Sequence, residues 1–164
     1  MRYLVNYILL VLPISGCFSF KRWILSFVKI HVRKGGNING HTWFYGRGNI
    51  VVGENTWIGP RCRFYSDITA DISIGKNCDI APEVAFVTGS HEISDKSRRA
   101  GRGFCESIIV EDGCWIGARV TIMGGVTIGA GSIIGAGSFV NRNISSNRIA
   151  VGVPAKVIRQ LDDA

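Results

Sequence analysis

An aliphatic residue recurs every six positions along much of this chain. In the C-terminal half this slot is filled by Val110, Ile116, Ile122, Ile128, Ile134 and Val140. A small or β-branched residue follows four positions later at Cys114, Val120, Val126, Ser132 and Ser138. Neither the 3.6-residue period of a helix nor the alternation of a strand gives a period of six. Such a period is typical of a parallel β-helix, in which each hexad forms one strand and one corner and about three hexads close a coil.

The same pattern continues upstream with two shifts of register. The aliphatic or aromatic slot falls at Ile38, Phe44, Ile50, Val52, Ile58, Phe64, Ile74, Ile80 and Phe86. The accompanying small or branched slot is expected at Thr56, Cys62, Ile68, Cys78, Val84 and Ser90. The longest interruption, residues 88–107, carries Arg98, Arg99, Gly101, Arg102 and Gly103, and we expect it to leave the coil as a loop.

These patterns predict an all-β fold, a parallel β-helix solenoid formed by residues 35–149 with a protruding loop at 88–107. Residues 1–34 are expected to form an N-terminal helical segment, and residues 150–164 a tail with a short helix. The 21 glycines and 4 prolines in 164 residues disfavour a helical bundle and suit a chain with many sharp turns. The length fits one domain. The period does not give the handedness, because left-handed coiling departs from the usual crossover rule.

The five cysteines are best explained by packing. No two have the C-x-x-C spacing of a metal or redox motif, and Cys62, Cys78 and Cys114 all occupy the small slot of their hexads. A thiol there fills the same space as serine or valine. We therefore expect no metal, and an odd number of thiols fits a reducing compartment.

The net charge of +7 is concentrated at the N-terminus. Residues 1–34 hold no acidic residue, and their basic residues are Arg2, Lys21, Arg22, Lys29, Arg33 and Lys34. A nucleic-acid-binding protein would spread such charge over its folded surface, so the asymmetry favours an attachment segment and argues against nucleic acid as a partner.

The N-terminal segment has three interpretations. It is apolar from Tyr3 to Phe20 and is followed by Lys21, Arg22 and Trp23, as in a helix lying in the cytoplasmic membrane interface. The run from Ile14 to Cys17 imitates a lipoprotein processing site. The third interpretation is a helical cap whose apolar face packs on the first coil or on a neighbouring subunit.

The C-terminal motifs resemble those of the hexapeptide-repeat acyltransferases, especially the maltose and galactoside O-acetyltransferases and relatives that acetylate bacterial polysaccharides. The similar motifs, within about residues 50–160, are Trp115-Ile116-Gly117-Ala118, Gly125-Val126-Thr127-Ile128-Gly129, Ile134-Gly135-Ala136-Gly137-Ser138 and Gly152-Val153-Pro154-Ala155-Lys156. The resemblance implies a left-handed β-helix, a homotrimer with active sites between subunits, and acetyl-CoA as the acetyl donor.

Thr88-Gly89-Ser90-His91 matches the catalytic histidine motif of that family. Transfer of an acetyl group to a hydroxyl requires a base that removes the hydroxyl proton, and imidazole titrates near neutral pH. His31 and His41 lie in the N-terminal segment and the first coil, so His91 is the candidate catalytic residue.

The resemblance also implies donor and acceptor residues. The candidate coenzyme A contacts are Ala118, Ala136, Asn141, Arg142, Lys156 and Arg159, although Lys156 and Arg159 would also fit a solvated helix face. The candidate acceptor contacts are Arg61, Asp67, Asp71 and Trp115. Two of these, Asp67 and Asp71, would equally suit turns at a register shift. The galactoside branch has a serine where Ala118 stands, so an oxyanion contact at Ala118 would come from a backbone N–H. It has an acceptor-binding asparagine where Arg61 stands, so the acceptor specificity of that branch does not transfer to this chain.

The sequence therefore predicts a cytoplasmic acetyl-CoA-dependent O-acetyltransferase acting on a sugar hydroxyl of a surface polysaccharide or lipid-linked glycan, with peripheral contact to the membrane. The alternative is acetylation of serine or another small molecule. A γ-class carbonic anhydrase would need three histidines around zinc, and a purely structural solenoid would show a regular threonine array and no large loop.

Overall fold

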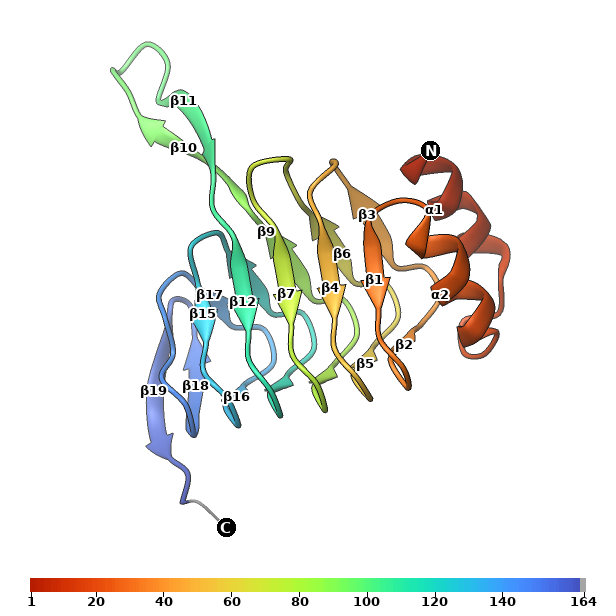
Figure 1. Cartoon of the computed structure of the whole chain (residues 1–164). Coiled ribbons are helices and arrows are strands. Elements are labelled where there is room, and N and C mark those ends of the chain that lie inside the picture. The colour runs from red at the N-terminus through yellow and green to blue at the C-terminus, as the bar shows by residue number, and fades with distance from the viewer. Residues whose placement is uncertain (163–164) are drawn as a thin grey trace.

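The chain winds in turn through three parallel sheets, as the computed structural model of residues 1–162 shows (Figure 1). The first sheet contains β1 (Ile30–Val32), β4 (Ile50–Val52), β7 (Ile72–Ile74), β12 (Ile108–Val110) and β15 (Thr127–Ile128). The second contains β2 (Asn37–Ile38), β5 (Trp57–Ile58), β8 (Asp79–Ile80), β13 (Trp115–Ile116) and β16 (Ile133–Ile134). The third contains β3 (Trp43–Tyr45), β6 (Arg63–Tyr65), β9 (Ala85–Val87), β14 (Thr121–Met123) and β17 (Phe139–Val140). We call these three sheets together the coil. It begins with β1, inside residues 1–34, the range predicted to form the N-terminal helical segment.

Strand pairing explains the register shifts of the sequence. Val110 pairs with Ile128 and Ile116 with Ile134, so one turn of the coil is three hexads, as predicted. Earlier turns are longer, and all their extra residues lie at the corner where the chain passes from the third sheet to the first. We call this the insertion corner. It spans residues 45–50, 65–72 and 87–108 in successive turns, so the two short shifts and the long loop are insertions at one place.

The recurring slots face the interior and stack on one another. Phe44, Phe64 and Phe86 are fully buried in successive turns, with ring centroids 5.0 and 4.7 Å apart. The aliphatic slots of the first and second sheets stack in the same way and, from Ile38 onward, are at most 1% exposed, whereas Val32 in the first turn is partly buried. Stacked burial of this kind supplies the main stabilisation of a repeat fold, because each turn covers the apolar surface of the next.

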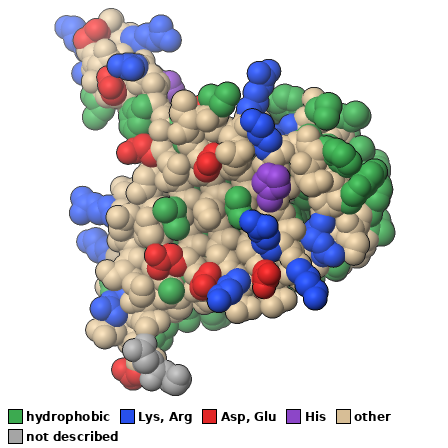
Figure 2. Space-filling model, in the orientation of Figure 1, with side chains coloured by type: hydrophobic (Ala, Val, Ile, Leu, Met, Phe, Trp, Pro, Cys, Tyr) green, Lys and Arg blue, Asp and Glu red, His purple; other side chains and the backbone are tan. Residues whose placement is uncertain are grey.

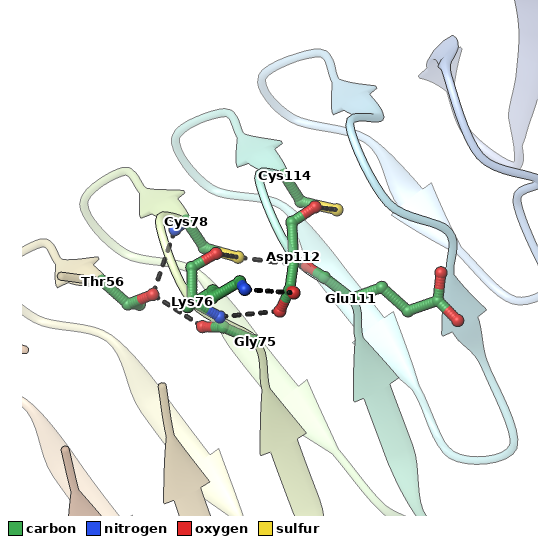
Figure 3. A network of polar contacts seen from close by, with 7 residues as sticks. All are labelled: Thr56, Gly75, Lys76, Cys78, Glu111, Asp112 and Cys114. Carbon is green, nitrogen blue, oxygen red and sulfur yellow. Dashed lines mark hydrogen bonds and ion pairs between the residues drawn. The ribbon is translucent and has the colours of Figure 1, made fainter. Parts of the chain in front are cut away.

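The small slot also forms hydrogen bonds along the coil axis. The Thr56 hydroxyl donates to the backbone carbonyl of Gly75 at 2.6 Å, and the Cys78 thiol donates to the backbone carbonyl of Glu111 at 3.1 Å (Figure 3). Cys114 and Ser132 continue the column with carbonyls of the following turn. Within residues 1–162 no three His, Cys, Asp or Glu side chains gather to hold a metal ion. The inward cysteines are therefore core residues that also satisfy corner carbonyls.

Two residues assigned to the small slot are not inward. Ile68 is 70% exposed and Ser90 is exposed, because the chain has already left the coil at the insertion corner. Ser66 and Thr88 are buried instead, and their hydroxyls donate to the carbonyls of Tyr45 and Tyr65 in the preceding turn.

Two helices, α1 (Arg2–Val11) and α2 (Phe18–Ser26), cover the open end of the first turn (Figure 1). Helix α1 lies against β3, and α2 lies against β1 and β2. Their inward apolar side chains, Val5, Leu9, Ile24 and Leu25, belong to the continuous core. The segment is thus a helical cap on the first coil, and neither described helix is long and apolar enough to cross a membrane.

A buried arginine fastens the cap. The Arg2 guanidinium donates hydrogen bonds to the carbonyls of Tyr45, Gly46, Val28 and Gly48 and to the Ser66 hydroxyl, at 2.7–3.3 Å. Burial lowers the pKa of Arg2 from its ordinary value. These carbonyls belong to α2's C-terminal connection and to the insertion corner, so one side chain joins both helices to the first turns.

The predicted C-terminal helix is wrong for the described part of the tail. Residues 148–160 form the hairpin of β18 (Arg148–Gly152) and β19 (Ala155–Gln160), and residues 163–164 of the predicted tail lie outside the described residues. Strand β18 pairs in parallel with β16, and β19 pairs antiparallel with β18. The open edge of the second sheet needs a strand partner, and this pairing outweighs any local helical tendency.

We predict that Arg2→Ala lowers the free energy of unfolding by about 2–4 kcal/mol, because it leaves a cluster of inward carbonyls without a donor. Thermal unfolding followed by circular dichroism measures the change. Arg98→Ala, at the exposed tip of the 88–107 segment, is the control and should leave the transition unchanged. Equal stability of both variants would contradict the anchoring role of Arg2.

Candidate active site

The predicted loop is a β-hairpin that projects from the insertion corner (Figure 1). Its strands are β10 (Gly89–Ile93) and β11 (Ala100–Cys105), which pair antiparallel with an irregularity between His91 and Ile93. His91 is exposed on β10 and faces Gly103 on β11. The hairpin therefore holds the candidate base outside the coil interior, on a hydrogen-bonded frame.

His91 lines an open groove of about 580 Å³ at the base of this hairpin. The groove is also lined by Tyr65, Asp67, Phe104 and Cys105. A Cβ atom added at Gly103 would lie 3.7 Å from the His91 Nε2 atom, so the imidazole lies directly over a residue without a side chain. The ring is thus accessible beside an apolar and aromatic wall.

The two candidate aspartates have structural partners at the insertion corner. Asp67 accepts hydrogen bonds from the backbone N–H and hydroxyl of Thr69 at 3.0 and 2.8 Å, and these bonds lower the pKa of Asp67. Asp71 accepts from the backbone N–H and side chain of Asn49 at 3.0 and 3.2 Å. Both therefore stabilise turns, and of the two Asp67 lines the His91 groove.

A second hollow, of about 530 Å³, joins three of the predicted site residues. Arg61, Ala118 and Ala136 line it together with Glu83 and Arg119. The Glu83 carboxylate lies 3.0 Å from Arg61 and 2.9 Å from Arg119. The hydrogen bond from Arg119 is the main cause of the lowered pKa of Glu83, and Arg61 adds to it. Two cations share one anion here, so the hollow keeps a positive charge.

This hollow lies at the corner between the second and third sheets, where the backbone takes an unusual conformation. Arg61, Glu83 and Arg119 occupy equivalent places in successive turns with φ between 59° and 65°. Such left-handed positions usually carry glycine or asparagine, and strain at other residues tends to accumulate at functional sites. The corner between the first and second sheets follows the ordinary rule, with Asn55, Asn77 and several glycines.

The other predicted residues are dispersed. Asn141 lines a small hollow of about 230 Å³ with Ser90 and Phe104 at the hairpin base. Arg142 is exposed just beyond β17. Trp115, 56% exposed, lies on the outer face of β13, in none of these three hollows. Lys156 and Arg159 are exposed on β19, so the alternative of a helix face does not apply to them.

Sequence reasoning missed several lining residues. Tyr65 and Phe104 form the aromatic wall beside His91, and Glu83 and Arg119 complete the charged cluster. The ion pairs join positions in successive turns, so sequence separation hides them. One signal was available: Arg119 directly follows Ala118 in a matched motif.

Within one chain the His91 groove and the Ala118–Ala136 hollow have no lining residue in common. The groove lies where strands of the third sheet end, and the hollow lies where those strands begin. A single copy therefore does not bring His91 together with Ala118 and Ala136, whereas Asn141 lies in a hollow that shares Ser90 and Phe104 with the His91 groove.

Comparisons with known proteins place residues 107–142 in the family described as bacterial transferase hexapeptide, six repeats. The galactoside O-acetyltransferase of Escherichia coli K12 is 39% identical over 131 residues, covering 69% of this chain and 64% of its own. The polysialic acid O-acetyltransferase of E. coli O1:K1 is 36% identical over 135 residues, covering 82% of this chain and 43% of its own. This chain thus spans less than two thirds of the length of these curated relatives.

A solved galactoside acetyltransferase in complex with coenzyme A has the same fold. It superposes with a TM-score of 0.83 and 30% sequence identity, and the match covers 99% of this chain and 80% of that one. The fold agreement therefore extends over nearly the whole of this chain.

We predict a pH-dependent contribution of Glu83 to stability. Its folded-state pKa lies below the ordinary value of 4.5, so its stabilisation is present above pH 4.5 and is lost as pH falls through the lowered value. Glu83→Gln should unfold at a lower temperature than the wild type at neutral pH, with a difference that closes on acidification.

Thermal melts across this pH range measure the effect. The control Glu54→Gln removes an exposed carboxylate from another corner and should show no such convergence. A difference between Glu83→Gln and wild type that stays constant with pH would contradict the ion-pair assignment.

Proposed function

This chain belongs to the bacterial hexapeptide-repeat transferase family, and on that premise we propose that it transfers an acetyl group from acetyl-CoA to a sugar hydroxyl. The observation that carries the proposal is that His91 is accessible beside a groove, on a hairpin that leaves the coil. The run Thr88-Gly89-Ser90-His91 resembles the catalytic motif of the family. The relatives named for acetylation of galactosides and of polysialic acid support a sugar acceptor.

The proposed reaction is direct transfer in a ternary complex. His91 removes the proton of the acceptor hydroxyl while the hydroxyl oxygen attacks the thioester carbonyl carbon of acetyl-CoA. The tetrahedral intermediate collapses, the carbon–sulfur bond breaks, and the imidazolium returns the proton to the departing thiolate. Ala118 has no hydroxyl, so we assign stabilisation of the oxyanion to a backbone N–H.

We propose that the coil is left-handed and that three copies form the enzyme, with each site at a boundary between copies. The separation of His91 from the Ala118–Ala136 hollow within one chain supports this arrangement. A neighbouring copy would bring its own hairpin against the hollow. The base would then come from one subunit and the donor contacts from the other.

The donor would lie along the corner between the second and third sheets. Ala118 and Ala136 line the hollow in which the pantetheine arm would lie, and Arg61 and Arg119 supply positive charge for phosphate. Asn141 and Arg142 would contact the donor near the hairpin base. Lys156 and Arg159, exposed on β19, would meet the nucleotide end at the other end of the coil.

We place the reaction in the cytoplasm, with a surface polysaccharide or a lipid-linked glycan as acceptor. Asp67 and the aromatic wall of the His91 groove would contact the sugar, because aromatic faces and carboxylates suit hydroxylated rings. The second candidate acceptor is serine or another small alcohol or amine, since the donor site alone does not distinguish these compounds.

We predict that His91→Ala lowers kcat by at least about 100-fold, because general-base catalysis of this kind contributes about 100- to 10,000-fold. Mass spectrometry of an acceptor panel, scoring the gain of one acetyl group, measures it. His31→Ala, an exposed histidine on β1, is the matched control. Turnover by His91→Ala near that of wild type would remove the mechanism, and acetylation of serine but of no sugar would select the second acceptor class.

Mixed assemblies test the shared site. His91→Ala removes the base, and Ala136→Trp places a bulky side chain at an exposed position of the donor hollow. Coexpressed, the two inactive variants should regain part of the wild-type activity, because some boundaries receive an intact hairpin and an intact hollow. No recovery in assemblies shown by mass to contain both variants would place the whole site within one chain.

A further inference from the structure

The cap helices differ from an ordinary surface helix, because α1 is apolar on its outward as well as its inward side and its charged residue is buried. The polar residues of α1 other than tyrosine are Arg2 and Asn6, and both are buried. Asn6 exchanges hydrogen bonds with the backbone of Phe44 at 2.9 and 3.1 Å. Lys21 of α2 is fully buried and donates to the carbonyls of Pro13 and Ile14 at 2.7 and 3.2 Å. Arg2 and Asn6 thus fasten the cap to the coil from inside, and Lys21 joins α2 to the connection between the two helices.

The outer side of the same helices is apolar. We define the cap face by six exposed side chains: Tyr3, Leu4, Tyr7, Val11, Trp23 and Phe27. Each is 58–82% exposed. Figure 2 shows hydrophobic side chains gathered over this end of the molecule. Exposed apolar patches that are continuous over several residues mark interaction sites in soluble proteins.

The cap and the first turn carry charge of one sign, although Asp67 and Asp71 of the second turn lie beside Gly48 and Asn49. The first acidic residue of the chain is Glu54, so the cap and the first turn contain only basic charges. Lys29 and Arg47 line a hollow of about 620 Å³ together with Tyr3 and Phe27 of the cap face. Both basic residues are exposed, unlike Arg2 and Lys21. An apolar surface is therefore bordered by free cations.

We propose that the cap face binds an anionic lipid surface, with the helices lying in the headgroup region. Apolar side chains would enter the acyl boundary, and Tyr3, Tyr7 and Trp23 suit the interface, because their rings are apolar and their edges are polar. Lys29 and Arg47 would meet anionic headgroups. A second copy of the chain fits less well, because a face paired with itself would bring two basic borders together.

The proposed trimer would strengthen this contact, and this step alone rests on the proposed function. If three coils stand side by side with parallel axes, their caps lie at the same end. Three weak lipid contacts would then act together through their effective concentration. The enzyme would reach glycan intermediates held at the same surface.

Vesicle cosedimentation of the full chain tests the proposal. Wild type should bind phosphatidylcholine vesicles that contain phosphatidylglycerol and bind pure phosphatidylcholine weakly, with a marked loss at high salt. The variant Leu4→Gln/Val11→Gln/Trp23→Gln should bind about tenfold more weakly. Lys29→Glu/Arg47→Glu should lose the preference for phosphatidylglycerol.

Matched controls separate lipid binding from folding and from catalysis. Val153→Gln/Ile158→Gln removes exposed apolar side chains from the C-terminal hairpin and should bind vesicles like wild type. Circular dichroism melts should be unchanged in every variant, and acetyl transfer to a soluble acceptor should be unchanged in the cap-face and Lys29→Glu/Arg47→Glu variants, so failure of the lipid proposal is distinct from failure of the proposed function. Unaltered vesicle binding by the cap-face variant would overturn the proposal. If wild type instead binds no vesicles and the cap-face variant differs from it in oligomeric mass, the cap face is an interface between copies.

Discussion

Stacking of equivalent residues in successive turns is the constraint on which this structure depends. Each inward slot packs on the same slot one turn away, as in the phenylalanine column of the third sheet. A side chain of different size or polarity in that column would disturb its neighbours on both sides. The constraint also reaches the corners, where the hydroxyl or thiol of the small slot bonds to the adjacent turn. Regularity inside the coil therefore leaves only its corners and ends free to vary.

The variation is concentrated where it can serve function. Every inserted residue between β3 and β15 lies at the insertion corner, and the longest insertion carries His91. A second departure is chemical: the corner between the second and third sheets carries Arg61, Glu83 and Arg119 in a backbone conformation that favours glycine. These two corners are the ends of one sheet. In the proposed trimer, contact between copies would close a site built from both corners.

The ends of the coil pose a different problem, because an open parallel sheet exposes unpaired backbone groups. At the C-terminal end β19 covers the edge of the second sheet by pairing with β18. At the N-terminal end the helices cover it with side chains, and Arg2 and Asn6 supply the donors that a further strand would have supplied. Arg2 and Asn6 are committed to this inner task, and the outer surface of the cap carries the apolar side chains of the cap face.

The sequence by itself determined the coil. The sixfold recurrence of Ile116, Ile122 and Ile128 fixed the strands, the inward face and the three-hexad turn, because stacking tolerates few alternatives. An interruption of the repeat marked the projecting segment, and resemblance to the family motif made His91 the candidate base. Only the tertiary structure decided that the tail is a hairpin, that Arg2 is an internal anchor, and that Glu83 joins Arg61 to Arg119. Each of these depends on partners in another turn or at an exposed edge, and local sequence patterns carry no record of such contacts.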